Sequence, residues 1–225
     1  IDLGLGRAPG TDQMTLRALR RNPANAEKFP QDVQELQAFL APKDAAQQIE
    51  AVPGSGSNVP IWILGSSLFG AQLAASLGLP YGFASHFAPQ ALYQALEVYR
   101  MNFKPSAQLD KPYAMVGVNV IAAETDEEAR YLATSQLMSF TNLFRGTRGL
   151  MQPPIEDIET YWSPQEKAQA GQMLDCSVIG SHETVQNGLQ NLIEKTQADE
   201  LMIVSDIFDT TKRQRSIEIT AQAMA

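Results

Sequence analysis

The chain contains few of the side chains on which metal binding and hydrolytic catalysis usually depend. Its 225 residues include one cysteine, Cys176, and two histidines, His86 and His182. A single cysteine excludes an internal disulfide and a thiolate metal cluster. No group of histidines and carboxylates has the spacing of metal ligands. We therefore predict no metal site, and the sequence assigns no catalytic residue.

Basic residues are also scarce relative to acidic ones. There are 17 Lys and Arg against 25 Asp and Glu, which gives a net charge of −8. Nucleic-acid surfaces need clustered Lys and Arg, so this balance argues against a nucleic-acid partner. No apolar run approaches the ~20 residues that a membrane-spanning helix needs. We expect no membrane partner and a cytoplasmic protein.

The chain does contain a regular alternation of apolar strands and amphipathic helices. The strand-like runs occupy residues 1–5, 61–64, 81–84, 113–121 and 201–204. Helix start signals lie between them, since Thr125 with Glu128 and Ser163 with Glu166 have the spacing of capping boxes, and Ser181 precedes a third helix. This alternation is typical of α/β proteins with a parallel sheet.

Two arrangements fit such an alternation, an open doubly wound sheet and a closed (β/α)8 barrel. The five predicted strands are too few for the barrel, but the chain begins with Ile1 inside a strand-like run. About three further βα units before Ile1 would complete a barrel. We expect one domain over residues 1–225, with an excursion at about 140–177 that is either a lid or a packed surface loop.

Residues 61–86 have the pattern of one complete βαβ unit. Its first turn, Gly65-Ser66-Ser67, precedes a helix, where unpaired amides and the helix dipole favour an anion. Arg7 follows the first predicted strand and is the only cation directly after any of them. Because the carboxyl ends of parallel strands meet at one edge, we predict that Arg7 and the two serines hold a phosphate together.

Other interpretations of this region remain open. Arg7 could instead form a salt bridge with a nearby carboxylate such as Asp12. The GLGRAPG segment has Pro where the dinucleotide fingerprint needs Gly, and residues 65–70 have neither a Walker lysine nor a nucleophile elbow. His86 follows a predicted strand end, where a histidine is either structural or part of a site.

Four segments resemble bacterial luciferase-like, flavin-dependent monooxygenases, most closely the single-chain group described as alkanal monooxygenase-like. In chain order these segments are IDLGLGRAPGTD, WILGSSLFGAQLAASLGLPYGFASHF, YAMVGVNVIAAETDEEARYLA and VIGSHETVQNGLQNLIEKTQADELMIVSDIFD. The resemblance covers nearly the whole chain. It implies a TIM (β/α)8 barrel of the luciferase-like type, here a partial barrel without about three N-terminal βα units.

The resemblance also implies a set of cofactor-binding residues. An arginine and a serine turn contact the phosphate of FMN in this family, and a position after the next strand lines the cavity beside the isoalloxazine ring. The matching positions in this chain are Arg7, Gly65, Ser66, Ser67 and Gly70 for the phosphate, and His86 for the ring cavity. The family's catalytic histidine comes from early strands that this chain does not match.

The activity implied by the resemblance is an FMN-dependent monooxygenase. A separate flavin reductase would supply reduced flavin, which with O₂ would oxygenate a small apolar substrate such as an aldehyde. Three alternatives stay open: a non-catalytic flavin-binding protein, a deazaflavin-dependent oxidoreductase of the same superfamily, and an inactive remnant. The substrate and a homo-oligomeric state are not fixed by the sequence.

Overall fold

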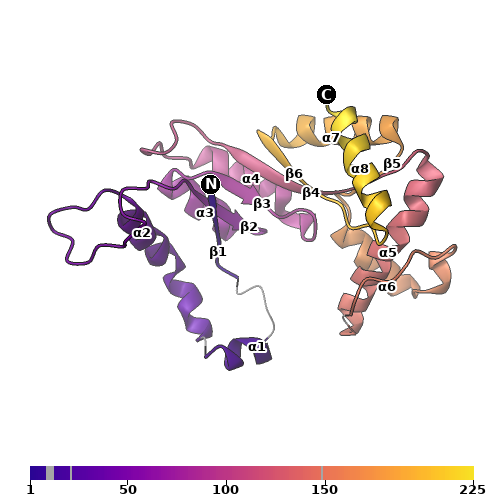
Figure 1. Ribbon diagram of the computed structural model, residues 1–225, viewed down its shortest axis with the longest axis horizontal. Helices are drawn as coiled ribbons and strands as arrows, with labels where there is room; N and C mark the ends of the chain where they lie inside the picture. Colours follow the sequence, from indigo (N-terminus) through magenta and orange to yellow (C-terminus); the bar gives the residue numbers. More distant parts are fainter. Residues whose placement is uncertain (9–12, 21, 148) are drawn as a thin grey trace. The chain divides into compact units, whose positions relative to one another are not determined.

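The computed structural model describes residues 1–8, 13–20, 22–147 and 149–225 (Figure 1). The chain forms two compact units. The first unit comprises Ile1–Phe83 with Tyr93–Ala114, and the second comprises Ala84–Leu92 with Met115–Ala225. That residues 1–225 form one barrel domain, with an excursion at about 140–177, stays a prediction.

The first unit is built on three parallel strands. Its elements are β1 (Leu3–Gly6), α1 (Gln13–Ala18), η1 (Pro23–Lys28), α2 (Phe29–Leu40), β2 (Ile61–Gly65), α3 (Leu68–Leu77), β3 (Tyr81–Phe83) and nearly all of α4 (Leu92–Met101). β1 pairs in parallel with β2, and β2 pairs in parallel with β3. Helix α3 connects β2 to β3 and packs against both strands (Figure 1).

Small residues let α3 approach the sheet closely. Ala71, Ala74 and Ala75 on this helix are fully buried, so its backbone lies near the strands. The helix ends at Gly78, whose φ of 65° is left-handed. A Cβ at Gly78 would lie 2.5 Å from the carbonyl oxygen of Lys104, so only glycine fits there. The helix predicted after Gly65-Ser66-Ser67 is confirmed, and it ends at this glycine.

The second unit is organised around β4. Its elements are η2 (Pro89–Ala91), β4 (Ala114–Ala122), α5 (Asp126–Arg145), η3 (Ile158–Thr160), α6 (Pro164–Met173), β5 (Val178–Gly180), α7 (His182–Thr196), β6 (Glu200–Val204) and α8 (Thr210–Ala223). β6 pairs in parallel with the first part of β4, and β5 pairs in parallel with its last three residues. Both units therefore confirm the predicted α/β class with parallel pairing.

One strand of the second unit was not predicted, and one predicted strand is partly exposed. β5 was not predicted, because its three residues form no apolar run long enough to stand out, and two of them are only half-buried. The predicted run at 201–204 is a strand, β6, and Met202 within it is 50% exposed. Among the described residues β6 pairs only with β4, so its other edge has no neighbouring strand.

The helix start signals are confirmed in part. Ser163 and Glu166 form a complete capping box at α6. At α5, Thr125 Oγ1 accepts from the Glu128 amide at 3.1 Å, but the Glu128 carboxylate pairs with Lys212 Nζ at 2.5 Å instead of returning to the cap. Ser181 stands at the start of α7, yet its side chain makes no capping hydrogen bond.

In the described part of the chain, no helix is both long enough and apolar enough to cross a membrane.

Candidate functional site

The ends of β1 and β2 bring two of the predicted site segments to one edge of the first unit. The strands run in parallel with Leu5 opposite Ile63 and Gly6 opposite Leu64. Arg7 is the next residue after β1, and Ser66 is the next residue after β2. Both segments therefore leave the sheet at its carboxyl edge, where ligands of parallel α/β proteins bind.

The side chain of Arg7 lies over the first turn of α3. Its guanidinium carbon is 3.9 Å from the centre of the Phe69 ring, which is a close cation–π contact. No carboxylate within the described ranges forms an ion pair with Arg7. The alternative partner Asp12 lies outside the described residues. The contact with Phe69 holds the positive charge of Arg7 beside the helix start while its N–H groups keep their bonding capacity.

Tyr81 stabilises the turn between β2 and α3. The hydroxyl of Tyr81 donates to the carbonyl of Ser67 at 3.1 Å. Burial raises the pKa of Tyr81, so it remains a protonated donor. A Cβ at Gly70 would lie 3.2 Å from the Tyr81 ring, and Gly65 lies against the Cα of Gly70. Gly70 thus lets the helix and the Tyr81 ring pack closely, whereas a Cβ at Gly65 would make only an ordinary contact of 3.7 Å.

Within the described ranges, no carboxylate is bound at the start of α3. Ser67 occupies the N-cap position with extended backbone, φ −147° and ψ 167°, but its side chain makes no capping hydrogen bond. The first turn of α3 contains no acidic residue. Ser66 is half-buried and Ser67 is exposed. Two hydroxyls and the first amides of a helix are therefore available to an incoming anion, next to a fixed guanidinium.

The remaining predicted site residue, His86, belongs to the second unit. It follows β3 and is half-buried. Burial lowers its pKa, and the negative charge of Asp206 acts in the opposite direction. The first unit thus contains Arg7, Gly65, Ser66, Ser67 and Gly70 at one strand edge. The role of His86 in the ring cavity stays a prediction.

Sequence reasoning missed three residues that shape these regions. Phe69 and Tyr81 position Arg7 and the serine turn, and neither stands out in an apolar stretch. Asn119, in the second unit, was detectable, because it is the one polar side chain within the apolar strand AMVGVNVIA. A buried amide in such a strand must find hydrogen-bond partners, and this signals a specific contact.

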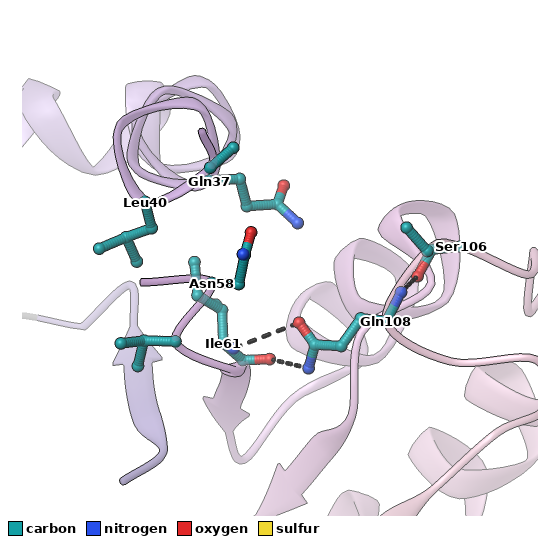
Figure 2. A pocket seen from close by; sticks show the side chains of 9 residues that line it. Gln37, Leu40, Asn58, Ile61, Ser106 and Gln108 are labelled. Atoms are coloured by element: carbon teal, nitrogen blue, oxygen red, sulfur yellow. Dashed lines mark hydrogen bonds between the residues drawn. The ribbon is translucent and has the colours of Figure 1, made fainter. Parts of the chain in front are cut away.

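A cavity of about 420 Å³ lies at the opposite end of β2 (Figure 2). Gln37 from α2 and Asn58 direct their amides into it, and the Gln108 side chain pairs with both backbone groups of Ile61, at 3.0 and 3.3 Å. This cavity opens at the amino end of the strand, away from the serine turn, where residues usually serve stability rather than ligand binding. The Asn58 and Gln108 amides hydrogen-bond to the local backbone.

Across the described ranges, no cluster of three or more His, Cys, Asp or Glu side chains is arranged to hold a metal ion.

Comparisons with known proteins identify the family of this chain. A family model described as luciferase-like monooxygenase matches residues 13–200. The chain is 50% identical over 220 residues to a luciferase-like monooxygenase of Escherichia coli K12, covering 97% of this chain and 66% of that protein. It is 51% identical over 222 residues to the Bacillus subtilis protein YvbT, covering 98% of this chain and 66% of that protein. The chain thus spans about two thirds of the length of these relatives.

Solved structures share the fold. The crystal structure of apo-MsnO8 is 29% identical and matches with a TM-score of 0.87, over 100% of this chain and 68% of that one. The oxygenating constituent of 3,6-diketocamphane monooxygenase from a Pseudomonas putida plasmid, solved with FMN, matches at 0.63 with 17% identity, over 100% of this chain and 70% of that one. An F420-dependent secondary alcohol dehydrogenase also matches at 0.63, with 9% identity, over 100% and 69% of the two chains. These likenesses confirm the luciferase-like barrel fold type. The chain belongs to the luciferase-like monooxygenase family.

Proposed function

We propose that this chain binds FMN and acts as a flavin-dependent monooxygenase. The observation that carries the proposal is the start of α3, where two serines and unpaired amides stand beside the guanidinium of Arg7. A phosphate dianion matches this set of donors in charge and hydrogen bonding. Gly65 and Gly70 allow the close backbone approach that such contacts need.

In this proposal the chain binds and orients, and the cofactor supplies the redox chemistry. Reduced flavin, when bound, provides the electrons with which O₂ is activated for transfer of one oxygen atom to an organic substrate. Arg7, Ser66 and Ser67 hold the phosphate, and Phe69 keeps the guanidinium in place between binding events. A separate flavin reductase supplies the reduced cofactor, and a small apolar aldehyde is the substrate class.

A deazaflavin is the second candidate cofactor. It is supported by the F420-dependent enzyme among the structures that share this fold. A deazaflavin nucleotide also carries phosphate, so the same α3 site suits it. The activity would then be hydride transfer rather than oxygenation.

Binding of FMN and riboflavin to the purified chain tests the phosphate site. Riboflavin has the same ring system without the phosphate, so the difference in affinity isolates the phosphate contribution. We expect FMN to bind at least about tenfold more tightly, as charge-assisted hydrogen bonds predict. Equal affinities, or no binding of FMN, would overturn the proposal. A parallel titration with F420 decides between flavin and deazaflavin.

Turnover separates an enzyme from a non-catalytic flavin binder. The chain is supplied with FMN, NADH, an added flavin reductase, O₂ and decanal, and decanoic acid is measured by mass spectrometry. We expect acid formation above that of the reductase alone. Tight FMN binding without product from decanal or shorter aldehydes would assign the chain as a binding protein.

A further inference from the structure

The turn that carries His86 is attached to β4 by two side-chain hydrogen bonds. Ser85 Oγ donates to the carbonyl of Gly117 at 2.6 Å, and Asn119 Nδ2 donates to the carbonyl of His86. Ser85 is 1% exposed and Asn119 is 3% exposed, so water does not compete for these bonds. The main chain at His86 therefore has one defined position on the strand.

Asn119 is in turn oriented by a glutamine on α5. Gln136 Nε2 donates to Asn119 Oδ1 at 3.1 Å, and Gln136 is 1% exposed. Because Asn119 Oδ1 accepts this bond, its amide nitrogen must face the carbonyl of His86. A flipped amide would place two oxygens against each other and leave two buried donors facing each other. Gln136 thus supports the orientation in which Asn119 holds the turn, while its own Oε1 has no partner among the described residues.

The two ring nitrogens of His86 have different surroundings. Its Nδ1 is buried and has no hydrogen-bond partner among the described residues. A proton on Nδ1 would be a buried N–H without an acceptor, which is costly. This cost favours the tautomer of the neutral ring that carries its hydrogen on Nε2, which is not among the buried atoms without a partner. Burial also lowers the pKa of His86, with Asp206 as the charged group that opposes this shift.

We propose that Asn119 and Gln136 are positioning residues that hold His86 as an uncharged Nε2–H donor to a ligand carbonyl oxygen. A neutral donor suits a neutral acceptor, and both a flavin ring and an aldehyde carry such an oxygen. The identity of the carbonyl compound rests on the proposed function. The orientation of His86 by the Asn119–Gln136 pair does not.

Nitrogen-15 NMR of the histidines in the full chain tests the positioning step. The chain has two histidines, and His182, exposed at the start of α7, is the internal reference. We expect His86 to show an unprotonated Nδ1 and a protonated Nε2 at neutral pH. A ring protonated on Nδ1, or a charged ring at neutral pH, would overturn the proposal.

Two substitutions at Gln136 and one matched control sharpen this test. Gln136→Met keeps the volume but removes the donor to Asn119, so we expect mixed tautomers and a His86 pKa closer to its ordinary value. Gln136→Glu should retain the wild-type pattern, because burial keeps its carboxyl protonated and able to donate. Ser135→Ala removes a neighbouring buried hydroxyl that has no partner in the described part of the chain, and it should change nothing. An unchanged His86 in Gln136→Met, if that variant folds, or a disturbed His86 in Gln136→Glu, would contradict the positioning role.

The ligand step is tested with lumiflavin and with decanal in separate titrations. The compound whose carbonyl accepts from His86 should shift its Nε2 signal, and Gln136→Met should bind that compound about fivefold more weakly. If neither compound shifts Nε2, the carbonyl assignment is wrong. Both compounds lack phosphate, so this result is independent of the comparison between FMN and riboflavin.

Discussion

Helices α3 and α7 both begin after a glycine–serine turn. A carboxylate of the chain binds at the start of α7, whereas the start of α3 lies beside a cation. Each follows a parallel strand through a glycine–serine turn, Gly65-Ser66-Ser67 at α3 and Gly180-Ser181 at α7. At α7 the chain supplies its own anion. The Asp126 carboxylate accepts from the Ser181 amide at 2.6 Å and from Thr184 Oγ1 at 2.9 Å.

These hydrogen bonds lower the pKa of Asp126, with the Ser181 amide as the largest cause. At α3 the first turn has no acidic residue, and a cation stands beside it instead. The difference teaches that a glycine–serine turn before a helix specifies an anion site in general. Whether that site binds a ligand depends on whether another element of the chain has already filled it.

The largest difference in stability between the two turns should come from replacing Gly65 and Gly180 with alanine. A Cβ at Gly180 would lie 2.4 Å from Thr184 Cγ2 and 2.7 Å from Asp126 Oδ1, whereas at Gly65 its nearest atom is 3.7 Å away. We expect Gly180→Ala to lower the free energy of unfolding by about 1–3 kcal/mol and Gly65→Ala to change it by less than about 0.5 kcal/mol. Urea denaturation measures both, and similar losses would show that the α3 turn is equally filled.

Removing the cation beside α3 should have the next largest effect. We expect Arg7→Ala to weaken FMN binding about tenfold or more, with riboflavin binding unchanged, because only FMN has the phosphate. Fluorescence titration measures both affinities. Arg213→Ala, at an exposed arginine on α8, is the control of equal charge change. A loss below about fivefold, or an equal loss for riboflavin, would remove Arg7 from the phosphate site.

Removing the charge at α7 should give a pH-dependent loss of stability. The pKa of Asp126 is lowered in the folded chain, so its stabilising contribution is present above the ordinary aspartate pKa and disappears as pH falls through the folded value. We expect Asp126→Asn to lower the thermal midpoint at neutral pH, and the difference from wild type to shrink below about pH 4. Asp110→Asn, at an exposed position, is the control. A difference that does not depend on pH would show that charge at α7 is unimportant.

The smallest effect on stability should come from Ser67. Its side chain caps nothing, so Ser67→Ala should change the free energy of unfolding by less than about 0.5 kcal/mol, whereas Ser163→Ala, which removes a capping box, should cost about 1 kcal/mol. The same Ser67→Ala variant should bind FMN about fivefold more weakly. A large stability loss with unchanged FMN affinity would mean that Ser67 serves the helix rather than a ligand.

Much of the fold could be predicted from particular residues. The small residues of α3 and its Gly78 stop, the Ser163–Glu166 box and the apolar runs of β2, β3 and β4 are local signals. β5 was missed because three residues are too few to show a hydrophobic periodicity. It forms a strand only because it pairs with β4. Only one half of the predicted capping box forms at α5, because the Glu128 carboxylate pairs with Lys212, which is 84 positions away.

The sequence by itself determined that a helix begins after Gly65-Ser66-Ser67 and that its first amides need partners, because turn and capping chemistry act over a few residues. Only the tertiary structure decided which helix start stays open, because Asp126 reaches α7 across 55 positions while Arg7 reaches α3 through the ring of Phe69. Distant side chains compete for the same local donors, and their positions depend on packing that no short segment encodes.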